Sequence, residues 1–460
     1  MQKVSSIFKT FDIRGLYKKE INSNVITKIA YSYVTEFKPS KVVLGFDARE
    51  GSIHLASIFK KNLLDLGVDV VNVGMVSTPR LYYSSFKCNI PFGVMFTASH
   101  EPKEYVGLKF TIKGLPPSKD KLLSLKKRFL SLDKFNFFST SSKRGKYEFL
   151  DISKDYVNDV LSFDNYSFKP FNIVVDCGNS VNSDIVHKIF NSGLSLNSTY
   201  ILYDTVDSSF PSHGLNPKEL KNQKPLARAI KKYKADLGIL WDGDADRVYF
   251  LDSFGNAIPP QFVAAIVGSY MVLNDKNRKK VVVDIRTGSI VKDLVEKSGG
   301  VVKVVKAWHT ELKYAMQKDS SIIFGSETSG HYVFRDFYKI DDGLLMSLMF
   351  LQAVSQNRKT LKNLLSFLYK RYFVPEEANF IVPNTQKLLD LVLNKYKSLG
   401  SVILLDGVSI KSSDWYFNLR PSKTEPLLRL NFSGTSTYKV KEFYDDLLNF
   451  ITFCGGSLVS

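Results

Sequence analysis

The sequence predicts an α/β protein in which three similar mixed α/β domains, each a βαβ-type sheet flanked by helices, are followed by a C-terminal α+β domain. The first observation is a pattern that occurs three times: an apolar, β-branched run ends in an aspartate, and a turn with glycine and serine follows. The three runs end at Asp47, Asp176 and Asp284. Apolar runs bounded by turn residues are typical of buried parallel strands.

The second observation is that each copy continues in the same way. A helical segment and a second strand follow, and a closing apolar run then leads into a polar loop that begins at Thr97, Asp242 or Gly325. Strands that alternate with helices predict right-handed βαβ units and parallel or mixed sheets. Because ligands bind such sheets at the carboxyl ends of the strands, we expect the three loops to face one central cleft.

The third observation is a change of pattern in the C-terminal part of the chain. Helical stretches near 387–398 and 439–451 enclose short strands near 402–407, 415–419 and 427–432, which predicts a separate α+β domain. A chain of 460 residues has room for about three or four domains. The predicted domains are 1–148, 149–253, 254–370 and 371–460.

The composition is that of an ordinary globular protein with a strong positive charge. The chain is 44% hydrophobic and 23% charged, with a formal net charge of +18. Its basic residues form short pairs and triplets, so a solvated lysine-rich surface explains the charge better than a nucleic-acid partner does. The longest apolar stretch, near 262–273, is too short for a membrane-spanning helix of ~20 residues. Residues 1–15 lack a signal core and the three cysteines are scattered, so we expect a cytoplasmic protein without a membrane partner.

The most informative loop is 242–247, which carries three aspartates at alternate positions. Asp242, Asp244 and Asp246 can converge on one small, hard cation, and Arg247 offers a fork for a phosphate or sugar oxygen. Three carboxylates this close repel one another without a cation, so we predict a magnesium site rather than a solvated turn. A calcium loop is the rival interpretation, but the bidentate glutamate and the flanking helices of that motif are missing.

The loop at 97–102 carries a candidate nucleophile. Ser99 follows a strand directly and has the chemistry of a nucleophile or phosphoryl carrier, with His100 beside it to polarise or position it. Lys109, a few residues further on, can neutralise a phosphate. The structural alternative is a turn serine that caps a helix.

Two further loops supply polar and cationic groups. The loop at 325–331 offers short polar side chains and a carboxylate that suit sugar hydroxyls. The segment 420–429 places two arginines, a lysine and two hydroxyls where a phosphate dianion can bind. Each loop alone is also explained as an ordinary polar or basic surface loop. Together the four loops indicate phosphoryl transfer on a phosphorylated sugar.

Five motifs in this order resemble the α-D-phosphohexomutase family over essentially the whole chain. They lie at 8–15, 97–102, 242–247, 325–331 and 420–429. The form Glu-x-Ser-Gly-His in the fourth motif is similar to the phosphomannomutase/phosphoglucomutase branch, although the phosphoglucosamine branch has a very similar loop. The resemblance implies an isomerase, an intramolecular phosphotransferase that interconverts hexose 1-phosphate and hexose 6-phosphate of mannose and/or glucose. It implies a phosphoserine enzyme and a 1,6-bisphosphate intermediate.

The resemblance also implies that the four domains carry, in order, the phosphoserine loop, the metal loop, the sugar loop and the phosphate loop. The implied catalytic residues are Ser99, His100, Arg14, Lys109 and His331, with His331 or Lys109 as the base. The implied ligands of one Mg²⁺ per chain are Ser99, Asp242, Asp244 and Asp246. The implied substrate-binding residues are Arg247, Arg286, His309, Glu327, Ser329, His331, Arg420, Ser422, Lys423, Thr424 and Arg429. Glucose 1,6-bisphosphate or an equivalent is the implied activator, and we expect a monomer or a weak homo-oligomer.

The sequence departs from the family pattern at several positions. Glu101 replaces an asparagine after the serine–histidine pair, and Val106 stands where a second asparagine is usual. Phe11 replaces a tyrosine, Lys423 replaces an asparagine, and 180–182 replaces a glycine-rich turn. No catalytic group is lost, but the first two changes bear on turnover and substrate preference. A phosphoglucosamine mutase, a magnesium-dependent phosphatase and a non-catalytic phosphosugar-binding protein remain as alternatives.

Overall fold

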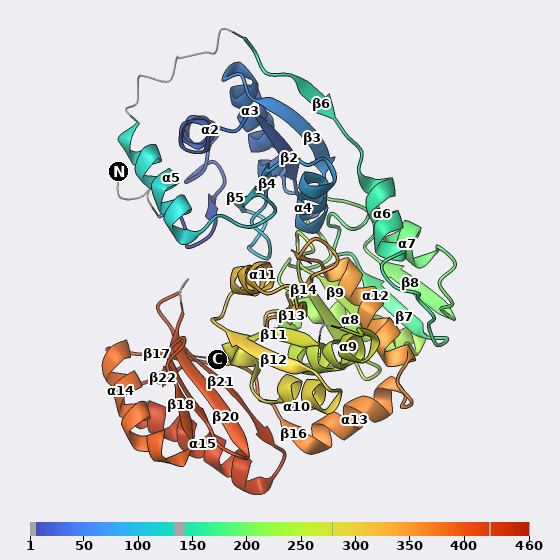
Figure 1. Cartoon of the computed structure of the whole chain (residues 1–460), viewed down its shortest axis with the longest axis vertical. Coiled ribbons are helices and arrows are strands. Elements are labelled where there is room, and N and C mark those ends of the chain that lie inside the picture. Colours follow the sequence, from blue (N-terminus) through green and yellow to red (C-terminus); the bar gives the residue numbers. More distant parts are fainter. Residues whose placement is uncertain (1–5, 133–142, 278, 423–424, 460) are drawn as a thin grey trace. The chain divides into compact units, whose positions relative to one another are not determined.

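The structure is a computed structural model that describes residues 6–132, 143–277, 279–422 and 425–459 (Figure 1). The chain forms two compact units. The first contains the described residues up to Ala257 together with Phe337–Leu348, and the second contains Ile258–Asp336 and the chain from Met349 onward. Within the described ranges, no helix is both long enough and apolar enough to cross a membrane.

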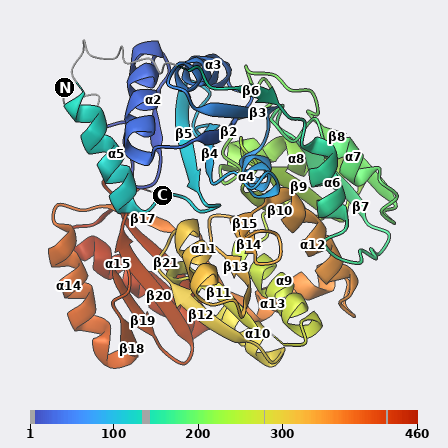
Figure 2. The same ribbon diagram turned by 45° about the horizontal axis from the view of Figure 1, so that its top comes forward.

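The first unit begins with a mixed sheet whose strand order is β1-β5-β4-β2-β3-β6. The strands are β1 (Ile13–Leu16), β2 (Lys41–Phe46), β3 (Asp69–Met75), β4 (Phe92–Phe96), β5 (Tyr105–Ile112) and β6 (Tyr147–Phe149). The helices are α2 (Ser23–Phe37), α3 (Glu50–Asp65), α4 (Thr78–Lys87) and α5 (Lys119–Ser131). Strand β2 alternates between the faces: Val42 and Leu44 join the core under α2, α3 and α5, whereas Gly45 faces Leu81 of α4. The sheet is therefore covered by helices on both faces (Figures 1 and 2).

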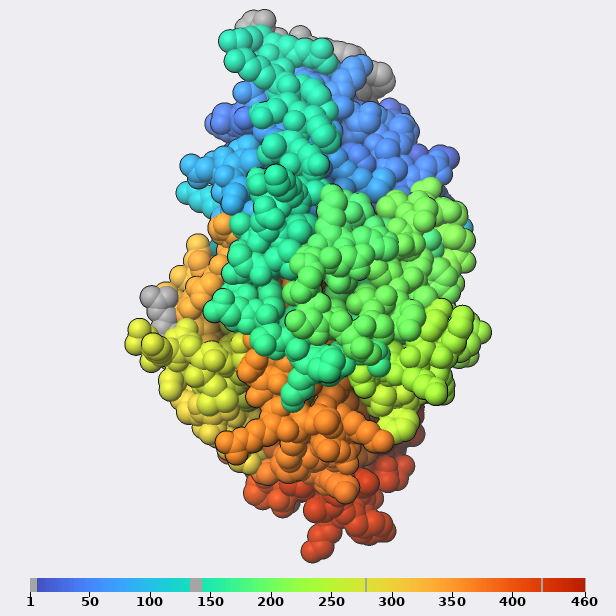
Figure 3. Space-filling view, turned by 90° about the vertical axis from the view of Figure 1, so that its right-hand side faces the viewer, coloured from blue at the N-terminus to red at the C-terminus, as the bar shows by residue number. Residues whose placement is uncertain are grey.

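A second mixed sheet in the same unit has the strand order β10-β9-β7-β8. Its strands are β7 (Asn172–Asp176), β8 (Ser198–Leu202), β9 (Leu237–Trp241) and β10 (Val248–Asp252), and its helices are α6 (Ser153–Leu161), α7 (Val186–Phe190) and α8 (Leu220–Tyr233). Figure 3 shows the stretch from β6 to α6 as a surface strip that passes from the first sheet's domain to the second. The unit also includes β15 (Ile340–Asp341) and the start of α12 (Gly343–Ser355).

The second unit contains a third mixed sheet, in which β12, β11, β13 and β14 lie in this order. The strands are β11 (Lys280–Asp284), β12 (Val301–Val305), β13 (Ile322–Ser326) and β14 (Tyr332–Phe334). The helical elements are α9 (Pro260–Asn274), the 3₁₀ turn η1 (Ile285–Thr287), α10 (Ile290–Lys297), α11 (His309–Lys318) and α13 (Leu361–Arg371). The apolar stretch near 262–273 is thus the buried helix α9.

The C-terminal part of the second unit is an antiparallel sheet in the order β18-β19-β20-β21-β17-β22, with β16 paired to β21. The strands are β16 (Tyr372–Phe373), β17 (Ala378–Ile381), β18 (Ser401–Ile403), β19 (Val408–Lys411), β20 (Trp415–Pro421), β21 (Leu428–Thr435) and β22 (Ser457–Leu458). The helices are α14 (Thr385–Tyr396), η2 (Lys397–Leu399) and α15 (Tyr438–Phe453). Phe417 and Leu419 of β20 pack into a core with α14 and α15. The alternate residues of β20 therefore lie on the opposite face.

These sheets confirm the predicted fold class: three mixed α/β sheets flanked by helices and a C-terminal α+β domain. Two details differ from the prediction. The predicted strand at 402–407 contains only the end of β18: residues 404–407 form a turn, and β19 begins after it at Val408. The closing strand of each α/β sheet also continues into an antiparallel neighbour, β5, β10 or β14, which the sequence pattern did not indicate. The exact domain boundaries stay a prediction.

Candidate functional site

The serine loop and the metal loop meet in the first unit. The serine loop joins β4 to β5, and the metal loop joins β9 to β10, so both occupy the same place in their sheets. Oγ of Ser99 donates a hydrogen bond of 2.9 Å to Oδ2 of Asp242 and lies 3.2 Å from Nδ1 of His100. Ser99 is fully buried. The predicted nucleophile and a predicted metal ligand are therefore in direct contact.

Ser99 has an unusual backbone conformation. Its φ of 56° lies in the left-handed region, which costs a residue other than glycine about 1–2 kcal/mol. The backbone N–H of Ser99 donates to Oγ1 of Thr97 at 2.9 Å, which helps to hold this conformation. Strain of this kind is retained where the surrounding structure fixes the backbone, and it is concentrated at functional sites.

The three aspartates form a compact, buried cluster. One carboxylate oxygen from each of Asp242, Asp244 and Asp246 lies within 4.8 Å of the others, and each residue is at most 2% exposed. Burial and the two neighbouring carboxylates raise the pKa of Asp242 well above its ordinary value. These residues fit a hard divalent cation, because all the donors are carboxylate oxygens. In addition, Oδ1 of Asp244 is buried without a hydrogen-bond partner among the described residues.

Two other side chains bind this cluster, one from the first sheet and one from the helix α4 beside it. Nζ of Lys109, on β5, lies 2.6 Å from Oδ2 of Asp244 and 2.5 Å from Oδ2 of Asp246. Burial opposes the charged form of Lys109, but the two carboxylates outweigh it and raise the pKa of the ammonium group. Oγ1 of Thr78 donates to Asp244 at 2.5 Å. A role for Thr78 was not predicted, because a serine–threonine–proline sequence at a helix start indicates only a cap.

Arg14 and Arg247 lie beside the same loops. Nη1 of Arg14 is 3.6 Å from Oε1 of Glu101, and its Nε donates to Asp12 at 2.7 Å. The extra carboxylate of Glu101 therefore has a cationic partner. Nε of Arg247 lies 3.7 Å from Oδ2 of Asp242. Val106, which replaces a polar residue of the family pattern, is fully buried in the apolar core of the first sheet.

Further backbone contacts fix the metal loop. Oγ of Ser180 donates to the carbonyl of Gly243 at 2.6 Å, so the departure at 180–182 supplies a hydrogen bond to this loop. The N–H of Gly343 donates to the carbonyl of Ala245 at 3.3 Å, and Ala245 has a φ of 58°. Neither contact was predicted, because the partners are far apart in the sequence.

The second unit contains the sugar loop, which joins β13 to β14. Arg286 of η1 forms an ion pair with Asp284 at 2.9 Å and a second with Glu327. Burial opposes the charge of Arg286, but the two carboxylates outweigh it and raise its pKa. Oγ of Ser329 is buried and has no hydrogen-bond partner within the described part of the chain. The structure thus brings Arg286, Glu327 and the sugar loop together.

Two predicted histidines lie next to each other in this unit. The rings of His309 and His331 stack with a centroid distance of 4.5 Å and an interplanar angle of 14°. His331 is buried, and its backbone carbonyl accepts a hydrogen bond of 2.9 Å from the N–H of Glu327. His331 therefore belongs to the same loop as the carboxylate that was predicted to bind the sugar.

Two of the predicted phosphate-binding residues, Arg420 and Arg429, lie on the face of the C-terminal sheet opposite its helices. Arg420 of β20 is directly opposite Arg429 of β21, and Arg429 pairs with Glu425 and with Glu377. The side chain of Arg420 is buried and has no hydrogen bond or ion pair with any residue that the structure describes. Burial and, next, the charge of Arg286 lower its pKa. Arg420 is thus close to Arg286. Ser422 follows at the end of the strand, and Lys423 and Thr424 lie outside the described residues.

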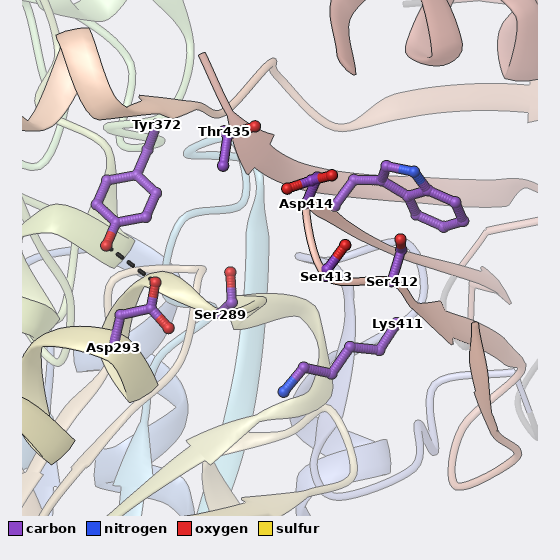
Figure 4. A pocket seen from close by; sticks show the side chains of 9 residues that line it. Ser289, Asp293, Tyr372, Lys411, Ser412, Ser413, Asp414 and Thr435 are labelled. Carbon is purple, nitrogen blue, oxygen red and sulfur yellow. Dashed lines mark hydrogen bonds between the residues drawn. The ribbon is translucent and has the colours of Figure 1, made fainter. Parts of the chain in front are cut away.

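A polar cavity of about 210 Å³ lies elsewhere in the second unit (Figure 4). Its lining residues are Ser289, Asp293, Tyr372, Lys411, Ser412, Ser413, Asp414, Trp415 and Thr435. The hydroxyl of Tyr372 donates to Oδ2 of Asp293 at 3.0 Å. The predicted site residues do not contribute to this lining, so the cavity is separate from the residue groups described above.

Comparison with known proteins agrees with the sequence motifs. Three family models match the chain: phosphoglucomutase/phosphomannomutase alpha/beta/alpha domain I at residues 5–135, domain II at 154–255 and domain III at 259–372. A phosphomannomutase of Escherichia coli K12 is 31% identical over 96% of this chain and 97% of its own length. A phosphomannomutase of Vibrio cholerae is 30% identical over 93% and 94%, respectively.

A solved structure shows the same architecture. The crystal structure of a phosphoglucomutase/phosphomannomutase family protein from Burkholderia thailandensis covers 99% of both chains, with a TM-score of 0.86 and 26% identity. The fold and these matches define an enzyme of the isomerase class, a mutase of phosphorylated hexoses. The chain belongs to the phosphoglucomutase/phosphomannomutase family of phosphohexomutases, which confirms the resemblance seen in the motifs.

Proposed function

We propose that this enzyme interconverts the 1-phosphate and the 6-phosphate of mannose and/or glucose by way of phosphorylated Ser99 and a hexose 1,6-bisphosphate. The observation that carries the proposal is the contact between Oγ of Ser99 and Asp242 within a buried carboxylate triad. The similarity to enzymes named phosphomannomutase supports mannose, and the family description adds glucose.

In the proposed reaction, the phosphoryl group leaves Oγ of Ser99 for the free hydroxyl of the hexose monophosphate. The proton of that hydroxyl passes to a base, for which His331 and Lys109 are the candidates. The resulting bisphosphate turns around and returns its other phosphoryl group to Ser99. Arg14, His100, Lys109 and Arg247 are proposed to orient the serine and the transferring group, because all four lie in the first unit and contact residues of its two loops.

Asp242, Asp244 and Asp246, together with the phosphate on Ser99, are proposed to hold one Mg²⁺. When bound, Mg²⁺ supplies positive charge that stabilises a transferring phosphoryl group. The carboxylates are fixed for this role by Thr78, by Lys109 and by the backbone contacts of the metal loop.

The second unit is proposed to bind the rest of the substrate. Glu327 and Ser329 suit the sugar hydroxyls, because a carboxylate accepts from two adjacent hydroxyls and Oγ of Ser329 is available for a polar partner. Arg420 is proposed to bind the non-reacting phosphate, since its side chain is buried and its Nε has no hydrogen-bond partner among the described residues. The other proposed ligands are Arg286, His309, His331, Ser422, Lys423, Thr424 and Arg429. We also propose that the enzyme is a monomer or a weak homo-oligomer, which light scattering can test.

A coupled assay tests the function. The purified enzyme is given Mg²⁺, a trace of glucose 1,6-bisphosphate as the proposed activator, and either mannose 1-phosphate or glucose 1-phosphate. Formation of the 6-phosphate from either sugar supports the proposal. Conversion of glucosamine 1-phosphate alone would favour the phosphoglucosamine branch, and steady release of inorganic phosphate would favour a phosphatase. Binding of these ligands without turnover would indicate a phosphosugar-binding protein.

A further inference from the structure

Arg49 lies directly beneath the serine loop and is fully buried. Its Nε donates to Oδ2 of Asp47 at 3.0 Å. Its Nη1 donates to the carbonyl of Pro102 at 2.7 Å, and its Nη2 donates to the carbonyls of Ser99 at 2.5 Å and Glu101 at 2.8 Å. One guanidinium group therefore binds three carbonyl groups within four consecutive residues of the loop that carries the proposed nucleophile.

This set of contacts requires an arginine. A guanidinium group has five N–H donors in a rigid, planar fork, and four donor contacts are used here. The ammonium group of a lysine has three donors on a single atom and cannot reach the same four acceptors at once. The guanidinium group has one further contact, because the ring of Phe210 lies over it at 5.9 Å.

The carbonyl group of Ser99 links this anchor to the metal loop. On one side this carbonyl oxygen accepts a hydrogen bond from Arg49. On the other side it lies against Gly243, since a Cβ added to Gly243 would be only 2.6 Å from it. Because Ser99 is held at a φ of 56°, its peptide would relax toward a more common conformation if this oxygen lost its donor. The direction of Oγ toward Asp242 depends on the same backbone.

We infer that Arg49 is a positioning residue that sets the backbone of the serine loop and thereby aims Oγ of Ser99 at the transferring phosphoryl group. The inference rests on the proposed role of Ser99 as phosphoryl carrier. Arg49 is 1% exposed, so it acts through the loop and not by touching the substrate. Arg49 should thus affect the rate of phosphoryl transfer and leave the affinity for the sugar phosphate almost unchanged.

The test compares two buried arginines of the first domain. Arg49→Lys keeps the positive charge but loses the planar set of N–H donors. Arg80→Lys is the matched control, because Arg80 is also about 2% exposed but binds Asp184 at 2.8 Å and Ser153 at 2.6 Å, away from the serine loop. The single-turnover rate of Ser99 phosphorylation by saturating glucose 1,6-bisphosphate is measured by rapid quench and intact mass. The half-saturating concentration and the thermal unfolding of each variant are measured in parallel.

We expect Arg49→Lys to slow phosphorylation by about 100-fold, because a misplacement of a reacting group by about 1 Å has an effect of this size. The half-saturating concentration of glucose 1,6-bisphosphate should change by less than about twofold. Arg80→Lys should lose stability but phosphorylate at nearly the wild-type rate. Equal phosphorylation rates for Arg49→Lys and wild type, or an equal loss of rate in both variants, would overturn the inference about Arg49 but not the proposed function. A wild-type enzyme that is never phosphorylated would overturn the proposed function as well.

A second variant covers the case in which Arg49→Lys does not fold. Asp47→Asn keeps the shape of the side chain but removes the charge that holds Nε of Arg49. It should slow phosphorylation in the same direction by about tenfold, because a charge-assisted hydrogen bond contributes more than a neutral one. A folded Asp47→Asn enzyme with wild-type phosphorylation would contradict the positioning role.

Discussion

Replacing Gly243 with alanine perturbs the contact between the two loops of the first unit. The new Cβ would lie 2.6 Å from the carbonyl oxygen of Ser99, and that oxygen belongs to the backbone and cannot rotate away. An ordinary contact begins at 3.4 Å, so the two loops must separate by about 0.8 Å. A shift of this size in a reacting group lowers the rate by about 100-fold, and overpacking costs about 1–3 kcal/mol of stability.

The assay measures kcat in the coupled reaction and the free energy of unfolding for Gly243→Ala. Gly268→Ala is the control, because Gly268 lies inside α9 and its nearest neighbour is a side-chain methyl group of Val295 at 3.3 Å, which has to move by only a few tenths of an ångström. We expect the control to gain up to about 1 kcal/mol from helix propensity and to keep wild-type kcat. If Gly243→Ala also keeps wild-type kcat, the reasoning about the Ser99 carbonyl group is refuted.

Three further perturbations test other parts of the account. Mg²⁺ at about 100 times its Kd should stabilise the wild type by about 2.7 kcal/mol in a thermal-shift titration, and Asp244→Asn should lose most of this gain. An equal stabilisation of wild type and Asp244→Asn by Mg²⁺ would contradict the metal site. Arg420→Met should raise KM for the hexose phosphate by about 10- to 100-fold, because charge-assisted hydrogen bonds contribute about 1.5–3 kcal/mol, and an unchanged KM would exclude this phosphate contact. His213 binds Asp176 at 3.0 Å and the carbonyl of Gly214 at 2.8 Å; burial lowers its pKa, but these partners outweigh burial and raise it above the ordinary 6.5. The stabilisation by His213 is therefore complete below the pKa that the imidazole has in the unfolded chain, and it is lost as the pH rises through the higher pKa of the folded protein. The difference in unfolding free energy between wild type and His213→Asn should thus be larger at low than at high pH. A difference that does not depend on pH would contradict this assignment.

The sequence predicted the central strands of the sheets and the chemistry of the loops that follow them. The apolar runs before Asp47, Asp176 and Asp284 became β2, β7 and β11, because a strand buried on both faces is apolar throughout its length. The antiparallel strands β5, β10 and β14 were missed, since their pairing is set by tertiary contacts and not by a local pattern.

Among the site residues, too, those with a local sequence pattern were predicted and those defined by tertiary contacts were not. Asp242, Asp244 and Asp246 were predicted because six consecutive residues already show the spacing of a metal-binding loop. Arg49 and Thr78 were not predicted, because their partners lie far away in the chain and many buried arginines and helix-capping threonines have purely structural roles. Val106 could not be interpreted from the sequence alone: the family pattern has an asparagine at this position, and the structure places the valine side chain in the apolar core.

The central claim is that Ser99 carries the phosphoryl group. The most direct test is the intact mass of the enzyme after incubation with glucose 1,6-bisphosphate and Mg²⁺, followed by peptide mapping of the modified residue. We predict a gain of one phosphoryl group, located on Ser99, that disappears on addition of excess hexose monophosphate and is absent from Ser99→Ala. A Ser99→Ala enzyme that turns over at the wild-type rate, or a phosphoryl group found on another residue, would contradict the mechanism.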